Sequence, residues 1–192
     1  MEKKKIAIFA SGSGTNAEKI MSCFKDHSEG KVVLILSNKA DAFVLERAKK
    51  FNIPVHVFDR PSFRESTKVL NILQEREVSL LVLAGFLWLV PEYLIRAYPQ
   101  RIVNIHPALL PAYGGKGMYG RHVHEAVIHN GEKESGISIH FVNEKYDEGA
   151  IILQAKCEVL PDDTPESLAE RIHLLEHKHY PEVIEKIIRE MN

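Results

Sequence analysis

Hydrophobic residues in the first half of the chain occur in short continuous runs separated by longer amphipathic segments. Glycine, proline or polar residues come within two positions after each run, as expected where a strand ends. The runs predict five strands, at residues 6–10, 32–36, 55–58, 80–83 and 102–105. Helices are predicted at about residues 15–25, 42–51 and 62–74, with a fourth opened by Pro91. This alternation is typical of a parallel sheet with helices on both faces.

The pattern changes beyond the fifth strand. A loop is predicted over residues 107–120, followed by a helix over about 121–129. Two further apolar runs, 136–142 and 151–155, are separated only by a short segment with a tight turn at 146–149. Because no helix lies between these two runs, they predict an antiparallel addition to the sheet.

A long helix is predicted at the end of the chain, over about residues 164–189. Asp163 or Thr164 is suited to cap its N-terminus. Pro181 lies inside it and is expected to kink or split it, since proline lacks the amide proton that a helix needs. The fold class predicted is therefore α/β: a Rossmann-like, mainly parallel sheet with helices on both faces and an antiparallel addition in the C-terminal half.

Composition narrows the class of protein. A chain of 192 residues with 45% hydrophobic residues is expected to form a single domain, residues 1–192, with a substantial core. A net charge of −1 predicts neither nucleic acid nor membrane as a partner. The longest apolar run covers residues 80–90, whereas a membrane-spanning helix needs about 20 residues. With two cysteines and no recognisable signal peptide, the protein is expected to be cytoplasmic.

A glycine-rich loop at residues 11–17 joins the first strand to the first helix. Free amides at the helix start, with the hydroxyls of Ser13 and Thr15, predict an anion site suited to phosphate. The loop also matches the weak dinucleotide fingerprint, so a dehydrogenase or nucleotide-binding module is an alternative. That fingerprint needs an acidic residue after the second strand, where Ser-Asn-Lys stands at 37–39. A phosphate monoester is therefore preferred, and a bare strand–helix turn is the remaining alternative.

Asn104 and His106 occur where the fifth apolar run stops, just before Pro107. Residues two apart in a strand point to the same side, so this amide and this imidazole are expected to face one spot. Together they can stabilise a developing oxyanion and move a proton, as acyl transfer to an amine requires. Taken alone, such a pair is more often a turn with a hydrogen-bonded structural histidine.

Ten histidines suggest a metal site. His122 and His124 are two apart on a predicted helix, as are His177 and His179, so neither pair shares a helix face. The chain also lacks a His-Glu-x-x-His motif and paired cysteine ligands. No metal is predicted, and His140, in the middle of a predicted strand, is expected to be structural or to support other residues.

The run Asn-Ile-His-Pro-Ala-Leu-Leu-Pro at residues 104–111 resembles a motif of the folate-dependent formyltransferases. The resemblance continues with His-Phe-Val at 140–142, Asp-Glu-Gly at 147–149 and Gln154, and it extends from residue 6 to about residue 187. It implies that Asn104, His106 and Asp147 are catalytic. Asp147 would hold His106 as an imidazolium or take protons through a water molecule.

The resemblance also implies how ligands bind. The phosphate of the substrate would lie on Gly14, Thr15 and Asn16, and Gly85 and Glu176 would complete the substrate site, with Glu176 accepting hydrogen bonds from ribose hydroxyls. The folate would be bound by Leu87, Trp88, Leu89, Val90 and Asp147. Many relatives have arginine at the position of Trp88, so a charge-assisted contact to the folate tail is not expected here.

The activity implied is transfer of the formyl group of 10-formyltetrahydrofolate to the amine of glycinamide ribonucleotide, in purine synthesis. The reaction would pass through a tetrahedral intermediate and use no metal, and the enzyme would be a monomer or a weak homodimer with small molecules as its partners. Formyltetrahydrofolate deformylase has an additional N-terminal domain, and methionyl-tRNA formyltransferase has a C-terminal domain and a basic surface. Neither feature is expected for this chain.

One segment departs from the pattern of the family. Residues 113–120 lengthen the passage from the Leu-Leu-Pro loop to the next helix and contain four glycines. This composition predicts a mobile flap that is open without ligand and closes over the substrates. Lys116, its single charge, could reach the substrate phosphate or the glutamate tail of the folate, while a solvated loop with no contact is the alternative.

Overall fold

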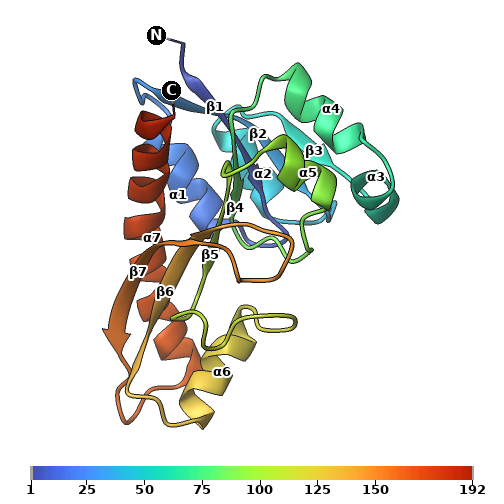
Figure 1. Cartoon of the computed structure of the whole chain (residues 1–192). Helices are drawn as coiled ribbons and strands as arrows, with labels where there is room; N and C mark the ends of the chain where they lie inside the picture. The colour runs from blue at the N-terminus through green and yellow to red at the C-terminus, as the bar shows by residue number, and fades with distance from the viewer. Residues whose placement is uncertain (1, 192) are drawn as a thin grey trace.

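A mixed sheet of seven strands forms the centre of the computed structural model, which describes residues 2–191 (Figure 1). The strands are β1 (Lys4–Phe9), β2 (Gly30–Ser37), β3 (Val55–Val57), β4 (Leu80–Leu83), β5 (Ile102–His106), β6 (Glu134–Phe141) and β7 (Ile151–Glu158). They lie in the order β3-β2-β1-β4-β5-β6-β7. Pairs among β1–β5 are parallel, whereas β5–β6 and β6–β7 are antiparallel. The predicted parallel sheet with an antiparallel addition is confirmed.

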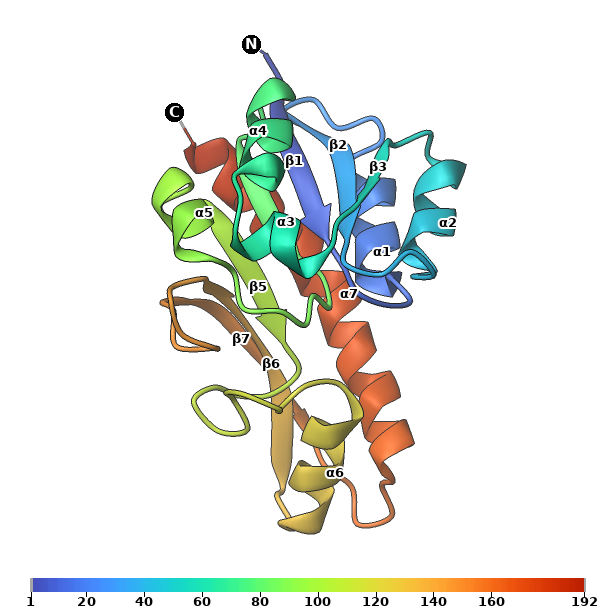
Figure 2. The same cartoon turned by 90° about the vertical axis from the view of Figure 1, so that its right-hand side faces the viewer.

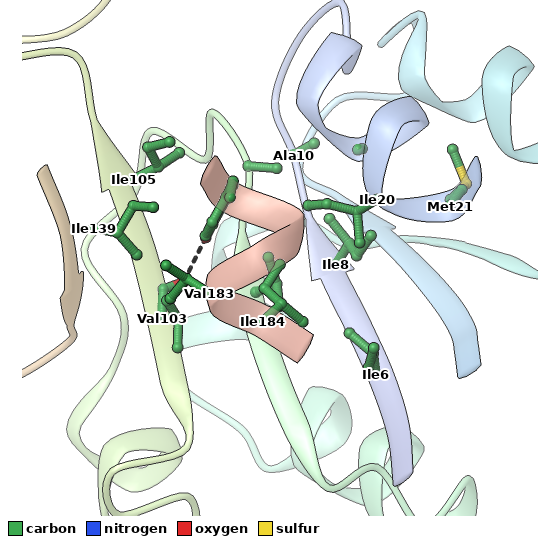
Figure 3. Close-up of a cluster of buried hydrophobic side chains, with 14 of the residues drawn as sticks. Ile6, Ile8, Ala10, Ile20, Met21, Val103, Ile105, Ile139, Val183 and Ile184 are labelled. Atoms are coloured by element: carbon green, nitrogen blue, oxygen red, sulfur yellow. Dashed lines mark hydrogen bonds between the residues drawn. The ribbon is translucent and has the colours of Figure 1, made fainter. Parts of the chain in front are cut away.

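Helices cover both faces of the sheet, as predicted (Figures 1 and 2). The helices are α1 (Thr15–Cys23), α2 (Val44–Lys50), α3 (Arg60–Arg64), α4 (Lys68–Glu75), α5 (Glu92–Ala97), α6 (Arg121–His129) and α7 (Pro165–Glu190). Apolar residues of α1, α2, α6 and α7 pack on one face, and those of α3, α4 and α5 pack on the other. Figure 3 shows Val183 and Ile184 of α7 against the strand residues Ile6, Ile8 and Val103.

The single helix predicted over residues 62–74 is wrong, because the structure has two helices there. Asp59 caps α3 by accepting a hydrogen bond from the Ser62 amide at 2.9 Å, so the first helix begins earlier. The Ser66 hydroxyl then donates to the Ser62 carbonyl at 2.9 Å. This side chain competes with the backbone for that carbonyl, which is a common cause of helix interruption.

Helix α7 runs unbroken through Pro181, so the expectation that proline would split it is wrong. An interior proline costs about 3 kcal/mol through its missing hydrogen bond. Packing opposes this cost, since Tyr180 and Ile184 are fully buried against the sheet. The Tyr180 hydroxyl also contacts the carbonyl oxygens of Leu83 and Val103, at 2.9 and 3.0 Å. Tyr180 thus holds the helix to β4 and β5 immediately before Pro181, and Ile184 is buried just after it.

The topology brings three loops together at one edge of the sheet. β1 lies between β2 and β4. The connection that follows β1 therefore leads to β2 on one side of it, whereas the connection that follows β4 leads to β5 on the other side. A crevice opens outside the carboxyl ends of the strands where the order reverses in this way. The loops that follow β1, β4 and β5 therefore surround one space.

Within residues 2–191, no helix is long and apolar enough to cross a lipid bilayer.

Candidate active site

A cavity of about 650 Å³ lies at the carboxyl ends of β1, β4 and β5. The glycine loop after β1 and the apolar segment after β4 form two of its walls. All twelve residues that the sequence and its family resemblance indicated as site residues line it: Gly14, Thr15, Asn16, Gly85, Leu87, Trp88, Leu89, Val90, Asn104, His106, Asp147 and Glu176. The cavity is also large enough for a drug-sized ligand.

Asn104, His106 and Asp147 come together on one wall of the cavity. Asn104 and His106 lie on β5, two residues apart, and Asp147 comes from the turn between β6 and β7. The Asn104 amide donates to Asp147 Oδ1 at 3.4 Å, and His106 Nδ1 lies 3.6 Å from Asp147 Oδ2. Asp147 has a φ of 56°, an uncommon value for a residue other than glycine that is often found at functional sites.

The surroundings of His106 affect whether its imidazole is neutral or protonated. Burial lowers the pKa of His106 and outweighs the opposite effect of the nearby Asp147 carboxylate. The lowered pKa favours the neutral imidazole near pH 7, which differs from the expectation that Asp147 holds His106 as an imidazolium. Burial acts to raise the pKa of Asp147, but the polar surroundings, which include the hydrogen bond from the Gly115 amide, lower it below its usual value and favour the carboxylate.

His140 belongs to the same cluster. It lies on β6 directly opposite Asn104. Its Nδ1 donates to the Phe141 carbonyl at 2.9 Å, which leaves Nε2 free to accept a hydrogen bond from the Asn104 amide at 3.2 Å. This histidine therefore orients Asn104, a supporting role that the sequence indicated without showing its partner. Only the register between β5 and β6 identifies that partner.

The glycine loop is shaped by contacts that the sequence did not show. Ser11 is buried, and its hydroxyl donates to Asn38 Oδ1 at 2.7 Å and accepts from the Leu87 amide at 3.1 Å. Gly14 has a φ of 73°, and a Cβ there would lie 2.5 Å from the Val44 side chain. Glycine is thus needed at this position for packing against α2, in addition to any contact with a ligand.

Glu176 forms a second polar cluster that lines the cavity. It is buried and accepts hydrogen bonds from the Asn16 amide at 2.8 Å and from His173 Nδ1 at 2.9 Å. The bond to Glu176 raises the pKa of His173. Asn16 Oδ1 and His124 Nδ1 are buried beside it and have no hydrogen-bond partner among the described residues, 2–191. Buried unpaired atoms that line a cavity indicate contacts with a ligand, and the sequence did not single out His124 or His173 for this role.

The apolar segment after β4 forms an aromatic wall. The rings of Phe86 and Trp88 pack with those of Phe58 and Phe63, with centroid separations of 5.5–6.0 Å. Trp88 is therefore partly integrated in the core on this face of the sheet. Leu87 is 39% exposed, and with Leu89 it gives the wall an apolar surface suited to a flat heterocycle.

The glycine-rich segment 113–120 contacts the site at its beginning. The Tyr113 carbonyl accepts a hydrogen bond from His106 Nε2 at 2.7 Å, and the Gly115 amide donates to Asp147 Oδ2 at 3.0 Å. Residues 115–120, including Lys116, line the cavity. The beginning of this segment is thus bonded to His106 and Asp147, so a solvated loop without contacts is wrong for Tyr113 and Gly115, while closing of the segment over the substrates stays a prediction. Among residues 2–191, no group of three or more His, Cys, Asp or Glu side chains could hold a metal ion.

Comparisons with known proteins agree with this geometry. The chain matches the formyl transferase family over residues 4–184. It is 46% identical to a chloroplastic phosphoribosylglycinamide formyltransferase of Arabidopsis thaliana, over 98% of this chain and 66% of that protein. It is 38% identical to the phosphoribosylglycinamide formyltransferase of Bacillus subtilis, over 96% of this chain and 95% of that protein.

A solved structure of a phosphoribosylglycinamide formyltransferase has the same fold. The crystal structure of phosphoribosylglycinamide formyltransferase from Bacillus halodurans superposes with a TM-score of 0.87 at 40% identity, covering 96% of this chain and 95% of that one. The family match spans both the glycine loop and the turn that carries Asp147. With its fold, its cavity and its sequence in agreement, the chain belongs to the formyl transferase family.

Proposed function

We propose that this chain transfers the formyl group of 10-formyltetrahydrofolate to the amine of glycinamide ribonucleotide, a step of purine synthesis. The observation that carries the proposal is the convergence of Asn104, His106 and Asp147 on one wall of a cavity that also contains a glycine loop and an apolar slot. Membership of the formyl transferase family and similarity to phosphoribosylglycinamide formyltransferases support it. 10-Formyltetrahydrofolate would be a co-substrate, and no metal is required by the chemistry.

The reaction would begin when the substrate amine attacks the formyl carbon, which turns the formyl oxygen into an oxyanion. The Asn104 amide has two protons, one directed to His140 at 3.2 Å and one to Asp147 at 3.4 Å. The longer contact is the weaker one, so an oxyanion can replace it without loss of the contact to His140. Asn104 would thus stabilise the tetrahedral intermediate.

Proton transfer would use His106 and Asp147. Because His106 is neutral and its Nε2 proton is bound by the Tyr113 carbonyl, Nδ1 is free to accept a proton from the attacking amine. Asp147, 3.6 Å away, would stabilise the imidazolium that forms. The same proton would then go to the folate nitrogen as the carbon–nitrogen bond to the formyl group breaks.

The two substrates would occupy different walls of the cavity. The phosphate would lie at Gly14, Thr15 and Asn16, where the start of α1 favours an anion. Glu176 would accept hydrogen bonds from the ribose hydroxyls. The pterin would lie against the segment from Gly85 to Val90, with Asp147 next to it.

The proposal is tested by measuring tetrahydrofolate formed from 10-formyltetrahydrofolate, with and without glycinamide ribonucleotide. We expect product only when the ribonucleotide is present, in equal amount to formylated ribonucleotide. Product formed equally well without an amine would instead identify a hydrolase, and absence of product in both reactions would contradict formyl transfer altogether.

Thr15→Val is expected to raise the KM for glycinamide ribonucleotide while leaving the KM for the folate unchanged. A hydrogen bond to a charged group contributes roughly 1.5–3 kcal/mol, which corresponds to a rise of about 10- to 100-fold. Valine keeps the shape of threonine at the start of α1 and removes only the hydroxyl. Steady-state kinetics with each substrate varied in turn measure this effect.

The matched control is Ser22→Ala, which removes an exposed hydroxyl at the other end of the same helix. It should leave both KM values as they are. An equal rise of the two KM values in Thr15→Val would contradict the proposed position of the phosphate at Gly14, Thr15 and Asn16.

A further inference from the structure

Tyr113 contacts the catalytic histidine with its backbone and the far end of α6 with its side chain. Its carbonyl oxygen accepts a hydrogen bond from His106 Nε2 at 2.7 Å. Its phenol donates to Glu132 Oε1 at 2.7 Å and accepts from Asn130 Nδ2 at 2.9 Å. Asn130 is the C-cap of α6, and Glu132 lies two residues beyond it. The tyrosine therefore connects the end of a helix to the reacting centre.

The backbone of Tyr113 is held in an unfavourable conformation. Its φ is 56°, a value that bulky residues rarely adopt and that persists only when the surroundings impose it. Two features of the structure impose it here. The ring packs against the core on the α7 face of the sheet, and the phenol is bound at both of its hydrogen-bonding sites.

The carbonyl of Tyr113 determines which nitrogen of His106 carries the proton. A neutral imidazole has a single N–H, and a carbonyl oxygen can only accept. The 2.7 Å contact therefore requires the proton on Nε2 and leaves Nδ1 unprotonated, 3.6 Å from Asp147 Oδ2. The Gly115 amide, two residues further on, donates to that same carboxylate oxygen at 3.0 Å. One short segment thus orients both members of the proton-transfer pair.

We propose that Tyr113 is a positioning residue, whose phenol, anchored by Glu132 and Asn130, holds its own carbonyl against His106 Nε2 and so selects the tautomer that accepts a proton at Nδ1. The consequence for turnover rests on the proposed function. The tautomer itself does not, since it is a property of the chain without substrates.

Tyr113→Phe and Glu132→Ala test the proposal, because the first removes both hydrogen bonds of the anchor, the second removes the bond to Glu132, and both keep the aromatic ring in the core. Glu132→Gln retains an acceptor for the phenol and is the conservative variant. Glu134→Ala is the matched control, since Glu134 is a nearby exposed carboxylate whose partner is Lys156 at 2.9 Å. The nitrogen-15 chemical shifts of the His106 ring, measured near pH 7 in the full chain, report the tautomer directly.

We expect one tautomer, with the proton on Nε2, in the unmodified chain and in Glu132→Gln and Glu134→Ala. Tyr113→Phe should give a mixture of the two tautomers and a fall in kcat of roughly threefold to tenfold, the effect of one modest hydrogen bond. Both KM values should stay within about twofold. Glu132→Ala, which leaves the bond to Asn130 in place, should show a smaller change in the same direction.

The proposal is overturned if the unmodified chain carries its proton on Nδ1, or if Tyr113→Phe keeps both the tautomer and kcat of the unmodified chain. It is also overturned if Glu134→Ala changes the tautomer as much as Glu132→Ala does. Absence of formyl transfer by the unmodified chain would overturn the proposed function instead, while the nitrogen-15 shifts would still decide the positioning role.

Discussion

Asp147→Asn is expected to lower kcat for formyl transfer by roughly 10²- to 10⁴-fold, the usual contribution of general acid–base catalysis. The carboxylate lies 3.6 Å from His106 Nδ1 and from His140 Nε2, and it accepts hydrogen bonds from the Asn104 and Gly115 amides. Asparagine has nearly the same shape but no charge, so it cannot stabilise an imidazolium at His106. The KM values should change much less than kcat, because the glycine loop proposed for the phosphate and the apolar segment from Gly85 to Val90 proposed for the pterin are untouched.

The matched control for this variant is Glu148→Gln, which neutralises the adjacent carboxylate. Glu148 is exposed and pairs with Lys145 at 3.0 Å, outside the cluster around Asp147. Both proteins should have the circular dichroism spectrum and the Tm of the unmodified chain. Normal turnover by a correctly folded Asp147→Asn variant would contradict a role for Asp147 in the mechanism.

Gly149→Ala is expected to destabilise the turn that carries Asp147. A Cβ at Gly149 would lie 1.6 Å from the Phe141 carbonyl oxygen, so the backbone would have to move. Overpacking typically costs about 1–3 kcal/mol, and because the backbone itself must move here we expect a cost near the upper end, about 3 kcal/mol, which predicts a fall in Tm of roughly 6–12 °C for a chain of this length. That carbonyl also accepts the hydrogen bond from His140 Nδ1, so kcat should fall as well.

Thermal unfolding followed by circular dichroism measures the effect, with Gly12→Ala as the control for stability. A Cβ at Gly12 meets nothing within 4 Å, and its φ is not positive, so its Tm should stay within about 2 °C of the unmodified value. An unchanged Tm in Gly149→Ala would show that the turn can accommodate a side chain, and the glycine of the Asp-Glu-Gly motif would need another explanation.

The helix and strand pattern was largely predictable because it depends on local periodicity. Helix α6 and strand β4 have the predicted bounds, and the two late strands pair antiparallel as expected. Two local features were misjudged. Ser66 interrupts a helix through a side-chain bond that the hydrophobic pattern does not contain, and Pro181 is accommodated because Tyr180 and its neighbours are buried against the sheet.

The sequence by itself determined which chemistry is present and, within β5, how two of its members point. Asn104 and His106 share a side because strand periodicity is a local property. The family resemblance implied that Asp147 acts with His106, but strand periodicity could not place a residue 41 positions further along, and only the tertiary structure shows the two side chains together and His140 opposite Asn104. The tertiary structure also decided the neutral state of His106 and the proton on Nε2. These depend on burial and on a carbonyl supplied by another segment, and neither is encoded in the spacing of residues along the chain.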